Sequence, residues 1–357
     1  MSQKRSTWGH WNLWAEASRQ TMGWRFATAE DRETVIGQVV DAAEAASLTI
    51  TPSEFAFSPT RFRRGDGTSH FRPQHATVFT SEELLAAEDR LLARAESRTA
   101  PTVSTDVIAR VCQRKHHGHH LSDEQATALN RVAASARQLD LLIGPAGAGK
   151  TTAMYALRRA WEAEHGRGSV VGLAPSAAAA KVLADDLGID GENTTKWLHE
   201  HVRGTAGFRP GQMVIIDEAT LAGTLSLDRL TGLAEAAGAK VLLVGDWAQL
   251  QSVDAGGAFN LLTQRRDNPP ELTEVHRLAH SWERTASLDL RHGRTAAIAT
   301  YIRHDRVHEG STTQMLDAAY AAWRVDVASG RSSVLVTDAR QAVIELNTRA
   351  RAERILE

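Results

Sequence analysis

A glycine-rich stretch that directly follows an apolar run constrains the fold of this chain more than any other feature of its 357 residues. Residues 139–143 form the apolar run, which is typical of a buried strand, and Gly144–Thr152 follow it with the spacing G-x-x-x-x-G-K-T. The glycines let the backbone curl so that successive N–H groups point at one anion, and the next helix directs its positive end there. The pattern therefore predicts a phosphate-binding loop.

The side chains of this loop indicate what it binds. Lys150 supplies a point charge for the β- and γ-phosphates of a nucleotide, and Thr151 supplies a hydroxyl for Mg²⁺. We therefore expect ATP and Mg²⁺ as cofactors. A chance glycine-rich turn is the alternative, but the helical pattern of Met154, Leu157 and Trp161 follows directly. The residues expected to contact the nucleotide are Gly144, Pro145, Ala146, Gly147, Ala148, Gly149, Lys150, Thr151 and Thr152.

Length and composition narrow the class of protein. A chain of 357 residues is long enough for two domains or more. Its formal net charge of −2 creates no overall basic field, so contact with nucleic acid would depend on local features. The single cysteine, Cys112, excludes a disulfide framework, and no apolar run approaches the roughly 18 residues of a membrane span. We expect a soluble, cytoplasmic protein without membrane insertion.

Apolar runs and helical patterns alternate from residue 139 onward, which predicts an α/β fold with a parallel sheet. The runs are nearly continuous, as expected for strands that helices cover on both faces. The expected strands are 139–143, 169–173, 212–216 and 240–244. The expected helices are 149–163, 175–187, 220–237 and 255–265.

Three regions follow one another along the chain. Residues 1–100 predict a smaller, mostly helical α+β segment, with a charged helix at about 81–98 and turn signals around Pro101. Residues 101–270 hold the loop and the alternating pattern. Residues 271–357 are mostly helical, with one more buried strand expected at 333–336 before a final helix.

Polar residues follow two of the expected strands. Asp217 and Glu218 come directly after the run Val214–Ile216. Beside a phosphate loop, Asp217 can orient Mg²⁺ through a water, and Glu218 can take the proton of an attacking water; without the loop, such a pair is usually a solvated strand end. The next strand leads into Gly245–Leu250 and places Gln249 at the carboxyl edge of the sheet, where its amide can sense the γ-phosphate.

Together, these motifs resemble those of superfamily 1 helicases, in the branch that holds the RecD subunit and the helicase half of conjugative relaxases. The resemblance implies a RecA-like motor domain that hydrolyses ATP. It also implies roles for two further residues. Leu121–Gln125 resembles the segment that reads the adenine edge, here through Gln125. Leu272–Arg277 resembles motif IV, whose arginine, here Arg277, reaches the γ-phosphate across the interdomain cleft, with an ordinary surface arginine as the alternative.

Two more segments resemble the DNA-binding motifs of this family. Ala174–Ala180 resembles motif Ia and Thr194–His199 resembles motif Ib, which line the channel for single-stranded DNA. A strand end before a helix offers N–H groups to phosphates. Taken alone, Ser176 and Thr195 are more often helix caps. The DNA contacts that the resemblance implies are Pro175, Ser176, Thr195 and Lys196.

Residues 1–110 resemble the segment that joins relaxase to helicase in MobF-type conjugative relaxases, through Trp11–Gln20 and Phe71–Thr77. This resemblance implies other conjugative transfer proteins as partners, beside single-stranded DNA. Trp8, Trp11 and Trp14 fall near one helical face, which favours packing in a core over stacking on bases.

Two features of such relaxases are expected to be missing. Nicking needs a tyrosine nucleophile, but Tyr155, Tyr301 and Tyr320 all lie in the ATPase part or beyond it. Residues 115–120 (Lys-His-His-Gly-His-His) predict a solvated linker rather than a metal site, with adventitious metal binding as the alternative. Val334–Arg340 resembles the beginning of a second motor domain, so we expect the middle of a longer protein.

The sequence thus predicts an ATP-dependent DNA helicase or translocase motor of a conjugative relaxase, which acts on single-stranded DNA during plasmid transfer. Movement from 5′ to 3′ is implied by the resemblance alone. Two alternatives stay open: a RecD-type repair helicase, against which residues 1–110 argue, and a truncated module that binds nucleotide and DNA without translocation. With only the beginning of a second motor domain, the isolated chain is expected to hydrolyse ATP slowly and to unwind nothing.

Overall fold

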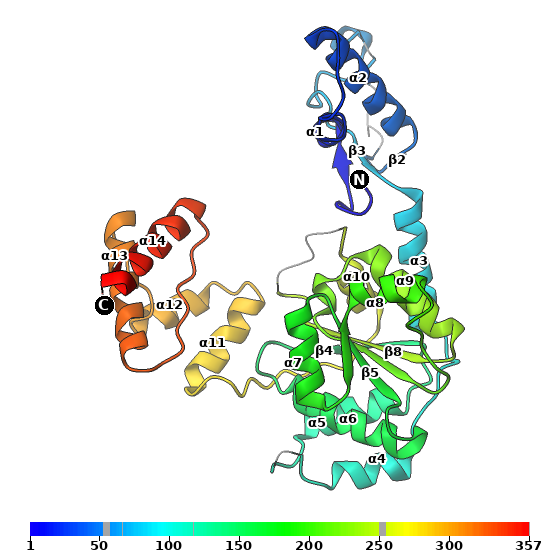
Figure 1. Cartoon of the computed structure of the whole chain (residues 1–357), viewed down its shortest axis with the longest axis vertical. Helices are drawn as coiled ribbons and strands as arrows, with labels where there is room; N and C mark the ends of the chain where they lie inside the picture. Colours follow the sequence, from blue (N-terminus) through cyan, green and yellow to red (C-terminus); the bar gives the residue numbers. More distant parts are fainter. Residues whose placement is uncertain (53–57, 66, 117, 250–254, 357) are drawn as a thin grey trace. The chain divides into compact units, whose positions relative to one another are not determined.

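The computed structural model describes residues 1–52, 58–65, 67–116, 118–249 and 255–356. The chain divides into two compact units, Met1–Leu278 and Ala279–Glu357. Figure 1 shows the helices and strands of each unit. Among the described residues, no helix combines the length and the apolar character that crossing a membrane requires.

Five described strands of the first unit form a parallel sheet in the order β4-β8-β7-β5-β6. Figure 1 labels β4, β8 and β5 of this sheet. The strands are β4 (Leu139–Ile143), β5 (Val170–Ala174), β6 (Asp190–Asn193), β7 (Met213–Ile216) and β8 (Lys240–Gly245). The four predicted strands are confirmed, each with ends within one residue of the prediction. The fifth, β6, was not predicted because its sequence is Asp-Gly-Glu-Asn. This polar run suits an edge strand that stays partly exposed.

Helices cover both faces of this sheet, which confirms the predicted α/β class with a RecA-like parallel sheet (Figure 1). Successive strand residues point to opposite faces, so Leu242 of β8 belongs to one core and Leu243 to the other. The first core includes α4 (Thr105–Cys112), α5 (Asp123–Ala133), α6 (Lys150–His165) and α7 (Ala177–Leu187). The second includes α3 (Glu82–Glu96), α8 (Thr194–Val202), α9 (Thr224–Ala236) and α10 (Ala258–Arg265).

A buried ion cluster interrupts the apolar sheet near the amino-terminal ends of its strands. Asp140 of β4 and Lys240 of β8 are both 0% exposed, and Lys240 Nζ lies 3.2 Å from Asp140 Oδ2. Arg266, directly after α10, pairs with the other oxygen of Asp140. Burial lowers the pKa of Lys240 to about 8, although the charge of Asp140 opposes this shift. The fold therefore depends on one carboxylate that neutralises two desolvated cations.

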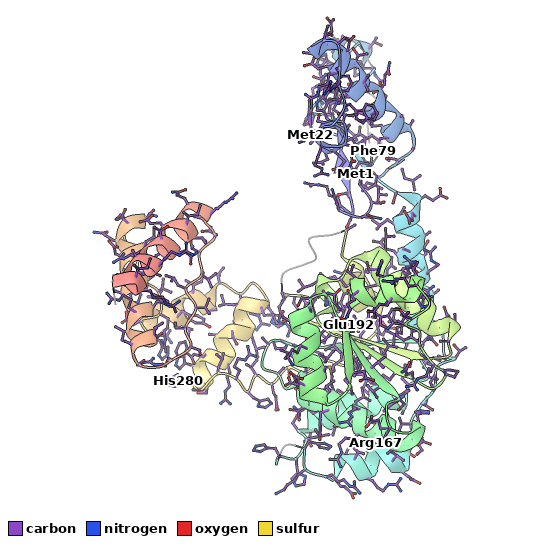
Figure 2. All side chains as sticks on the ribbon, in the orientation of Figure 1. Met1, Met22, Phe79, Arg167, Glu192 and His280 are labelled. Atoms are coloured by element: carbon purple, nitrogen blue, oxygen red, sulfur yellow. The ribbon has the colours of Figure 1, made fainter. Side chains whose placement is uncertain are left out.

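The segment before the sheet is a small, mostly helical α+β structure, as predicted. Strands β1 (Trp8–Gly9), β2 (Leu48–Thr49) and β3 (Val78–Thr80) pair antiparallel in the order β1-β3-β2. Helices α1 (His10–Gln20) and α2 (Ala29–Ala45) and the short 3₁₀ helix η1 (Thr60–Phe62) complete the segment. Its core consists of Trp8, Leu13, Ala17, Ile36, Val40 and Phe79, the last of which is labelled in Figure 2.

The prediction that three tryptophans share one helical face is wrong. Trp8 is held in β1 by pairing with Phe79 of β3, since α1 begins only after Gly9, and it is 4% exposed. Trp11 is 63% exposed and makes an edge contact with the ring of His75 at 5.3 Å. Trp14 is half-buried against the core. Only Trp8 is a core residue in the sense predicted.

Helix α3, which confirms the predicted charged helix, packs along α9 through ionic contacts. Arg94 Nη1 lies 2.6 Å from Asp228 Oδ1, and Arg94 Nε lies 2.9 Å from Glu235 Oε2. Arg90 Nη2 reaches the other oxygen of Asp228 at 2.6 Å. Two guanidinium groups on one carboxylate give geometric specificity as well as charge. These contacts fix α3 to a helix that covers the sheet.

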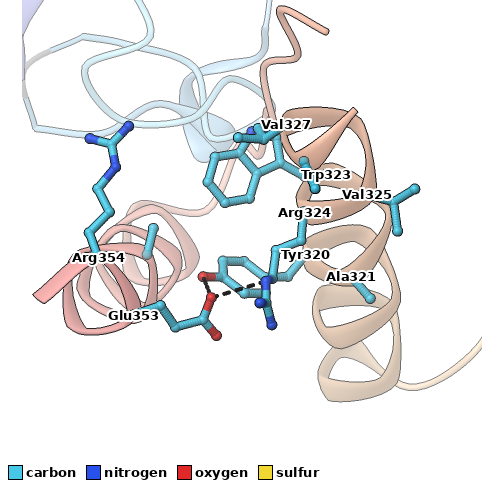
Figure 3. Close-up of a pocket in the computed structure, with 10 residues that line it drawn as sticks. Tyr320, Ala321, Trp323, Arg324, Val325, Val327, Glu353 and Arg354 are labelled. Carbon is cyan, nitrogen blue, oxygen red and sulfur yellow. Dashed lines mark hydrogen bonds and ion pairs between the residues drawn. The ribbon is translucent and has the colours of Figure 1, made fainter. Parts of the chain in front are cut away.

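The second unit consists of α11 (Ser281–Arg291), α12 (Ala296–Arg303), α13 (Thr312–Ala328) and α14 (Arg340–Leu356). Tyr320 of α13 is 1% exposed, and its hydroxyl donates to Glu353 Oε2 of α14 at 2.8 Å (Figure 3). The guanidinium of Arg349 lies 4.1 Å from the centre of the Tyr320 ring. Beside Tyr320 and Trp323 is a cavity of about 450 Å³ (Figure 3).

The buried strand predicted at 333–336 is wrong, whereas the helix expected after it is confirmed as α14. Residues 333–336 form no strand, and Val334 and Val336 are 85% and 81% exposed. A strand is stable only when a neighbour satisfies its backbone N–H and C=O groups. The described elements of this unit are all helices, so they offer residues 333–336 no neighbouring strand to pair with.

Candidate nucleotide site

The predicted phosphate loop connects β4 to α6, and its glycines have geometries that other residues would not fit. Gly147 and Gly149 have positive φ angles of 82° and 80°. A Cβ on Gly149 would lie 2.2 Å from Gln125 Nε2, and a Cβ on Gly147 would lie 2.4 Å from the Cβ of Arg277. The loop therefore leaves no room for side chains on the side that Gln125 and Arg277 occupy.

Lys150 is the first residue of α6 and bends back over the loop. Its Nζ donates to the carbonyl oxygens of Gly144 at 2.6 Å and Pro145 at 3.0 Å. A phosphate that enters the loop would offer the same ammonium stronger, anionic acceptors. Thr151 follows in the first turn and is exposed, so its hydroxyl is open to a metal ion or a phosphate.

Asp217 lies at the end of β7, on the same edge of the sheet as the loop. Its backbone N–H donates to Leu173 O at 2.9 Å, and its Oδ1 accepts from the N–H of Glu218 at 2.9 Å. Burial raises the pKa of Asp217 above its ordinary value, although the N–H of Glu218 and the charge of Lys150 act in the opposite direction. The fold thus brings the Asp217 carboxylate within electrostatic range of Lys150.

Glu218 has a strained backbone, with φ 50° and ψ 38° in the left-handed region. A residue with a Cβ is disfavoured there by roughly 1–2 kcal/mol. Its side chain is exposed, whereas the next residue, Ala219, is 0% exposed at the beginning of η2 (Ala219–Leu221). The turn therefore directs one carboxylate into solvent at the carboxyl edge of the sheet. Strain of this kind clusters at functional sites.

Gln249 is placed by a residue that the sequence patterns did not single out. Asp246, directly after β8, is 4% exposed, and its Oδ1 accepts from the N–H of Ala248 at 3.1 Å. Its Oδ2 accepts from Gln249 Nε2 at 3.3 Å, while the Gln249 side chain stays exposed. A polar residue at a buried strand end was the signal that could have identified Asp246. Leu250, the last residue of this predicted motif, lies outside the described residues.

Gln125 lies in the first turn of α5, against the loop, and is 6% exposed. Its Oε1 accepts from the N–H of Ser122 at 3.0 Å, which forms a capping box with the Ser122 hydroxyl. Its Nε2 donates to Gly149 O at 3.4 Å. The amide that was predicted to read an adenine edge therefore also caps its own helix and contacts the loop.

Arg277 lies in an extended segment that runs beside the loop. The N–H of Leu272 donates to Ile143 O at 2.8 Å, and the N–H of His276 donates to Gly147 O at 2.9 Å. These bonds bring Arg277 to the phosphate loop, which belongs to the same unit, Met1–Leu278. The Arg277 side chain is exposed. Lys150, Asp217, Gln125 and Arg277 are thus all close to one loop.

The four predicted DNA contacts lie at the carboxyl ends of β5 and β6. Ser176 caps α7, since its hydroxyl accepts from the N–H of Ala179 at 3.1 Å. Thr195 is not a cap, and that alternative is wrong. Asn193 caps α8 instead, because its amide oxygen accepts from the N–H groups of Thr195 at 3.0 Å and Lys196 at 3.1 Å.

Asn193 also joins the two predicted DNA segments. Its Nδ2 donates to Pro175 O at 2.7 Å, which holds the end of β5 beside the beginning of α8. Lys196 is exposed on α8, and its ammonium pairs with Glu192 and lies 3.7 Å from Glu200. The lysine is therefore partly neutralised by carboxylates that a polyanion would have to displace.

The histidine-rich linker is less solvated than predicted. His116 is 1% exposed, and its Nε2 donates to Val111 O at 3.0 Å. The backbones of His116 and His119 also pair with each other through two hydrogen bonds. A run of polar residues does not reveal that one of its rings is buried, and the sequence therefore predicted a fully solvated linker. His119 and His120 are exposed, and His117 lies outside the described residues.

The parallel sheet and the loop define a P-loop nucleotide-binding protein. Residues 120–312 match the model of the AAA domain family, and the chain belongs to this family. It is 32% identical over 280 residues to the probable conjugal transfer protein TraA of Sinorhizobium fredii. The matched region is 77% of this chain and 25% of that protein. It is 36% identical over 169 residues to the ATP-dependent RecD2 DNA helicase of Deinococcus radiodurans, or 44% of this chain and 22% of that one.

These relatives confirm the resemblance to conjugative and RecD-like helicases. The chain spans about a quarter of the length of these curated relatives. The crystal structure of the Pif1 helicase from Candida albicans is similar with a TM-score of 0.39 and 18% identity, over 57% of this chain and 54% of that one.

Proposed function

We propose that this chain is the ATP-hydrolysing motor portion of a conjugative relaxase, which acts as a DNA helicase or translocase on single-stranded DNA during plasmid transfer. One observation carries the proposal: a loop in which Gly147 and Gly149 have positive φ angles and no space for a Cβ lies on the same sheet edge as Asp217 and Glu218. Homology to TraA and RecD2 supports the choice of an ATP-driven DNA motor among P-loop proteins.

In this proposal, ATP with Mg²⁺ supplies the phosphoanhydride that is cleaved. The N–H groups of Gly144–Thr152 and the ammonium of Lys150 hold its phosphates, while Thr151 and Asp217 hold the metal ion. Glu218 takes the proton of the attacking water, and Gln249, oriented by Asp246, senses the γ-phosphate. Arg277 stabilises the negative charge of the transition state.

Nucleotide binding tests the first part of the proposal. Lys150→Ala should abolish most of the affinity for Mg·ATP in titration calorimetry, because the loop then lacks its only side-chain cation. Lys181→Ala is the matched control, since Lys181 is an exposed lysine that pairs with Asp185 on α7. Equal affinity of the wild type and Lys150→Ala would overturn the assignment of the loop.

Hydrolysis tests the second part. Glu218→Gln should bind Mg·ATP and lose about 10²–10⁴-fold in turnover, because a general base contributes roughly that much. Asp217→Asn should instead raise the concentration of Mg²⁺ that half-maximal turnover requires, because the metal ion loses an anionic ligand. Wild-type turnover in Glu218→Gln, together with a loss in Asp217→Asn, would mean that the two roles are assigned wrongly.

A RecD-type repair helicase is the second candidate, because of the identity to RecD2. The genes that flank this reading frame separate the two candidates. Transfer genes beside it support the conjugative motor, and recombination genes support the repair helicase. A module that binds without translocating would show nucleotide and DNA binding without turnover.

A further inference from the structure

The segment Thr273–Arg277 has no helix or strand of its own, yet it lies against the phosphate loop. Hydrogen bonds from Leu272 to Ile143 and from His276 to Gly147 hold its two ends. Val275 adds a buried side chain, 6% exposed. Between these two ends, Thr273 and Glu274 are exposed, and their backbone N–H groups bond to neither the loop nor β4 in the described residues.

Glu124 supplies those acceptors from another part of the chain. Its Oε2 accepts from the N–H of Thr273 at 2.9 Å and from the N–H of Glu274 at 3.1 Å. Its Oε1 accepts from the hydroxyl of Thr273. One side chain therefore takes three hydrogen bonds from two consecutive residues, across a sequence separation of 149 residues.

The chemistry of these bonds suits a carboxylate. Both oxygens of an ionised carboxyl group accept, and hydrogen bonds to a charged acceptor are stronger than those to a neutral amide. Burial raises the pKa of Glu124, but the hydrogen bonds from Thr273 and Glu274 and the charge of His276 outweigh it, so that the pKa lies below its ordinary value. The group is therefore ionised at neutral pH.

We propose that Glu124 is a positioning residue, which holds Thr273 and Glu274 and thereby places Arg277 at the phosphate loop. This inference rests on the proposed function, because it gives Arg277 its role toward the γ-phosphate. Gln125, the next residue, donates to Gly149 O in the same loop. The first turn of α5 thus links the nucleotide loop to the segment that carries Arg277.

Steady-state kinetics of the 357-residue chain test the proposal. In Glu124→Ala, kcat for ATP should fall about 10- to 100-fold, because a displacement of about 1 Å can cost roughly 10²-fold in rate. KM for ATP should change less than about threefold, since Arg277 acts on the transition state. Asp106→Ala is the matched control, because Asp106 is an exposed acid in the first turn of α4 and its loss should leave kcat unchanged.

A double-mutant cycle separates positioning from a merely structural role. If Glu124 acts through Arg277, Glu124→Ala combined with Arg277→Ala should be no slower than Arg277→Ala alone. Losses of kcat that multiply in the double variant would overturn the proposal. So would an unchanged kcat in Glu124→Ala.

Hydrogen exchange gives a readout that does not depend on ATP. The amides of Thr273 and Glu274 should exchange slowly in the wild type and at least tenfold faster in Glu124→Ala, which removes their acceptor, while amides of β4 stay protected. Equal exchange in both proteins would overturn the proposed contact. If Lys150→Ala binds ATP as well as the wild type does, the proposed function fails instead, and the exchange result still reports on Glu124.

Discussion

At the scale of single residues, two neighbouring acids at the carboxyl edge of the sheet differ in burial and in backbone strain. Asp217 is half-buried, and burial raises its pKa, whereas Glu218 is exposed and held at a positive φ of 50°. Two adjacent carboxylates thus have different surroundings, which suits the different roles proposed for them.

The strain at Glu218 leads to the first prediction. Glu218→Gly should raise the free energy of unfolding by up to about 1 kcal/mol, because glycine adopts this backbone without a steric penalty. The same variant should lose ATP turnover, since the carboxylate is gone. Urea unfolding and a phosphate-release assay check both parts. Asp185→Gly, at an exposed position of α7, is the control and should lower stability by about 0.5–1 kcal/mol. A loss of that size in Glu218→Gly would show that no strain is stored there.

At the scale of elements, the sheet holds both the loop and the buried ion cluster, at opposite ends of its strands. The loop follows the last residue of β4, whereas Asp140 is the second residue of the same strand. Lys240 begins β8, and Arg266 follows α10. A strand that carries the nucleotide loop is thus tied at its other end to a neighbouring strand and to a helix end.

The ion cluster predicts a large effect from one substitution. Asp140→Ala should lower the free energy of unfolding by about 3–5 kcal/mol, because Lys240 and Arg266 would be left without a buried counter-charge. The triple variant Asp140→Leu, Lys240→Leu, Arg266→Met should recover much of that loss, since it buries apolar groups and leaves neither cation without a partner. Asp190→Ala on exposed β6 is the control, with an effect within about 0.5 kcal/mol. Denaturant unfolding measures all three, and a loss under 1 kcal/mol in Asp140→Ala would contradict the prediction.

The same cluster predicts a pH dependence of stability. The pKa of Lys240 is about 8 in the folded protein, below the ordinary value of 10.5. Between these values the unfolded chain holds a proton that the folded chain has released, so this group makes the free energy of unfolding rise with pH, by at most about 1.4 kcal/mol per unit. The stability difference between the wild type and Lys240→Met should therefore increase from pH 8 to pH 10. Lys181→Met, at an exposed lysine, is the control. If the difference in the free energy of unfolding between the wild type and Lys240→Met does not change with pH, the lowered pKa of Lys240 is refuted.

At the scale of the whole molecule, a complete parallel sheet with its loop belongs to one unit, and the other unit is helical in its described residues. Translocation on DNA needs two motor domains that close on ATP and open on product release. The slow turnover expected of residues 1–357 stays a prediction. ATP hydrolysis should be measurable, should respond little to single-stranded DNA, and should not unwind a forked duplex. Robust unwinding by this chain would contradict that expectation.

Local sequence patterns predicted correctly those elements whose structure depends on the residues of one segment. The apolar runs at β4, β5, β7 and β8 and the glycine spacing of the loop are such patterns, because burial and backbone freedom act on each segment separately. The sequence predicted the position of the loop and of Asp217 and Glu218 at one sheet edge. It did not predict β6, whose polar residues form a strand only because β5 lies beside it.

What the sequence by itself determined is therefore the α/β class, the four apolar strands β4, β5, β7 and β8, and the position of the phosphate loop. Only the tertiary structure decided which distant groups meet. Glu124 reaches Thr273 across 149 residues, Arg266 reaches Asp140 across 126, and residues 333–336 lack a neighbouring strand. The physical reason is that a hydrogen bond or an ion pair depends on the separation of two groups in space, which a periodic pattern along one segment does not encode.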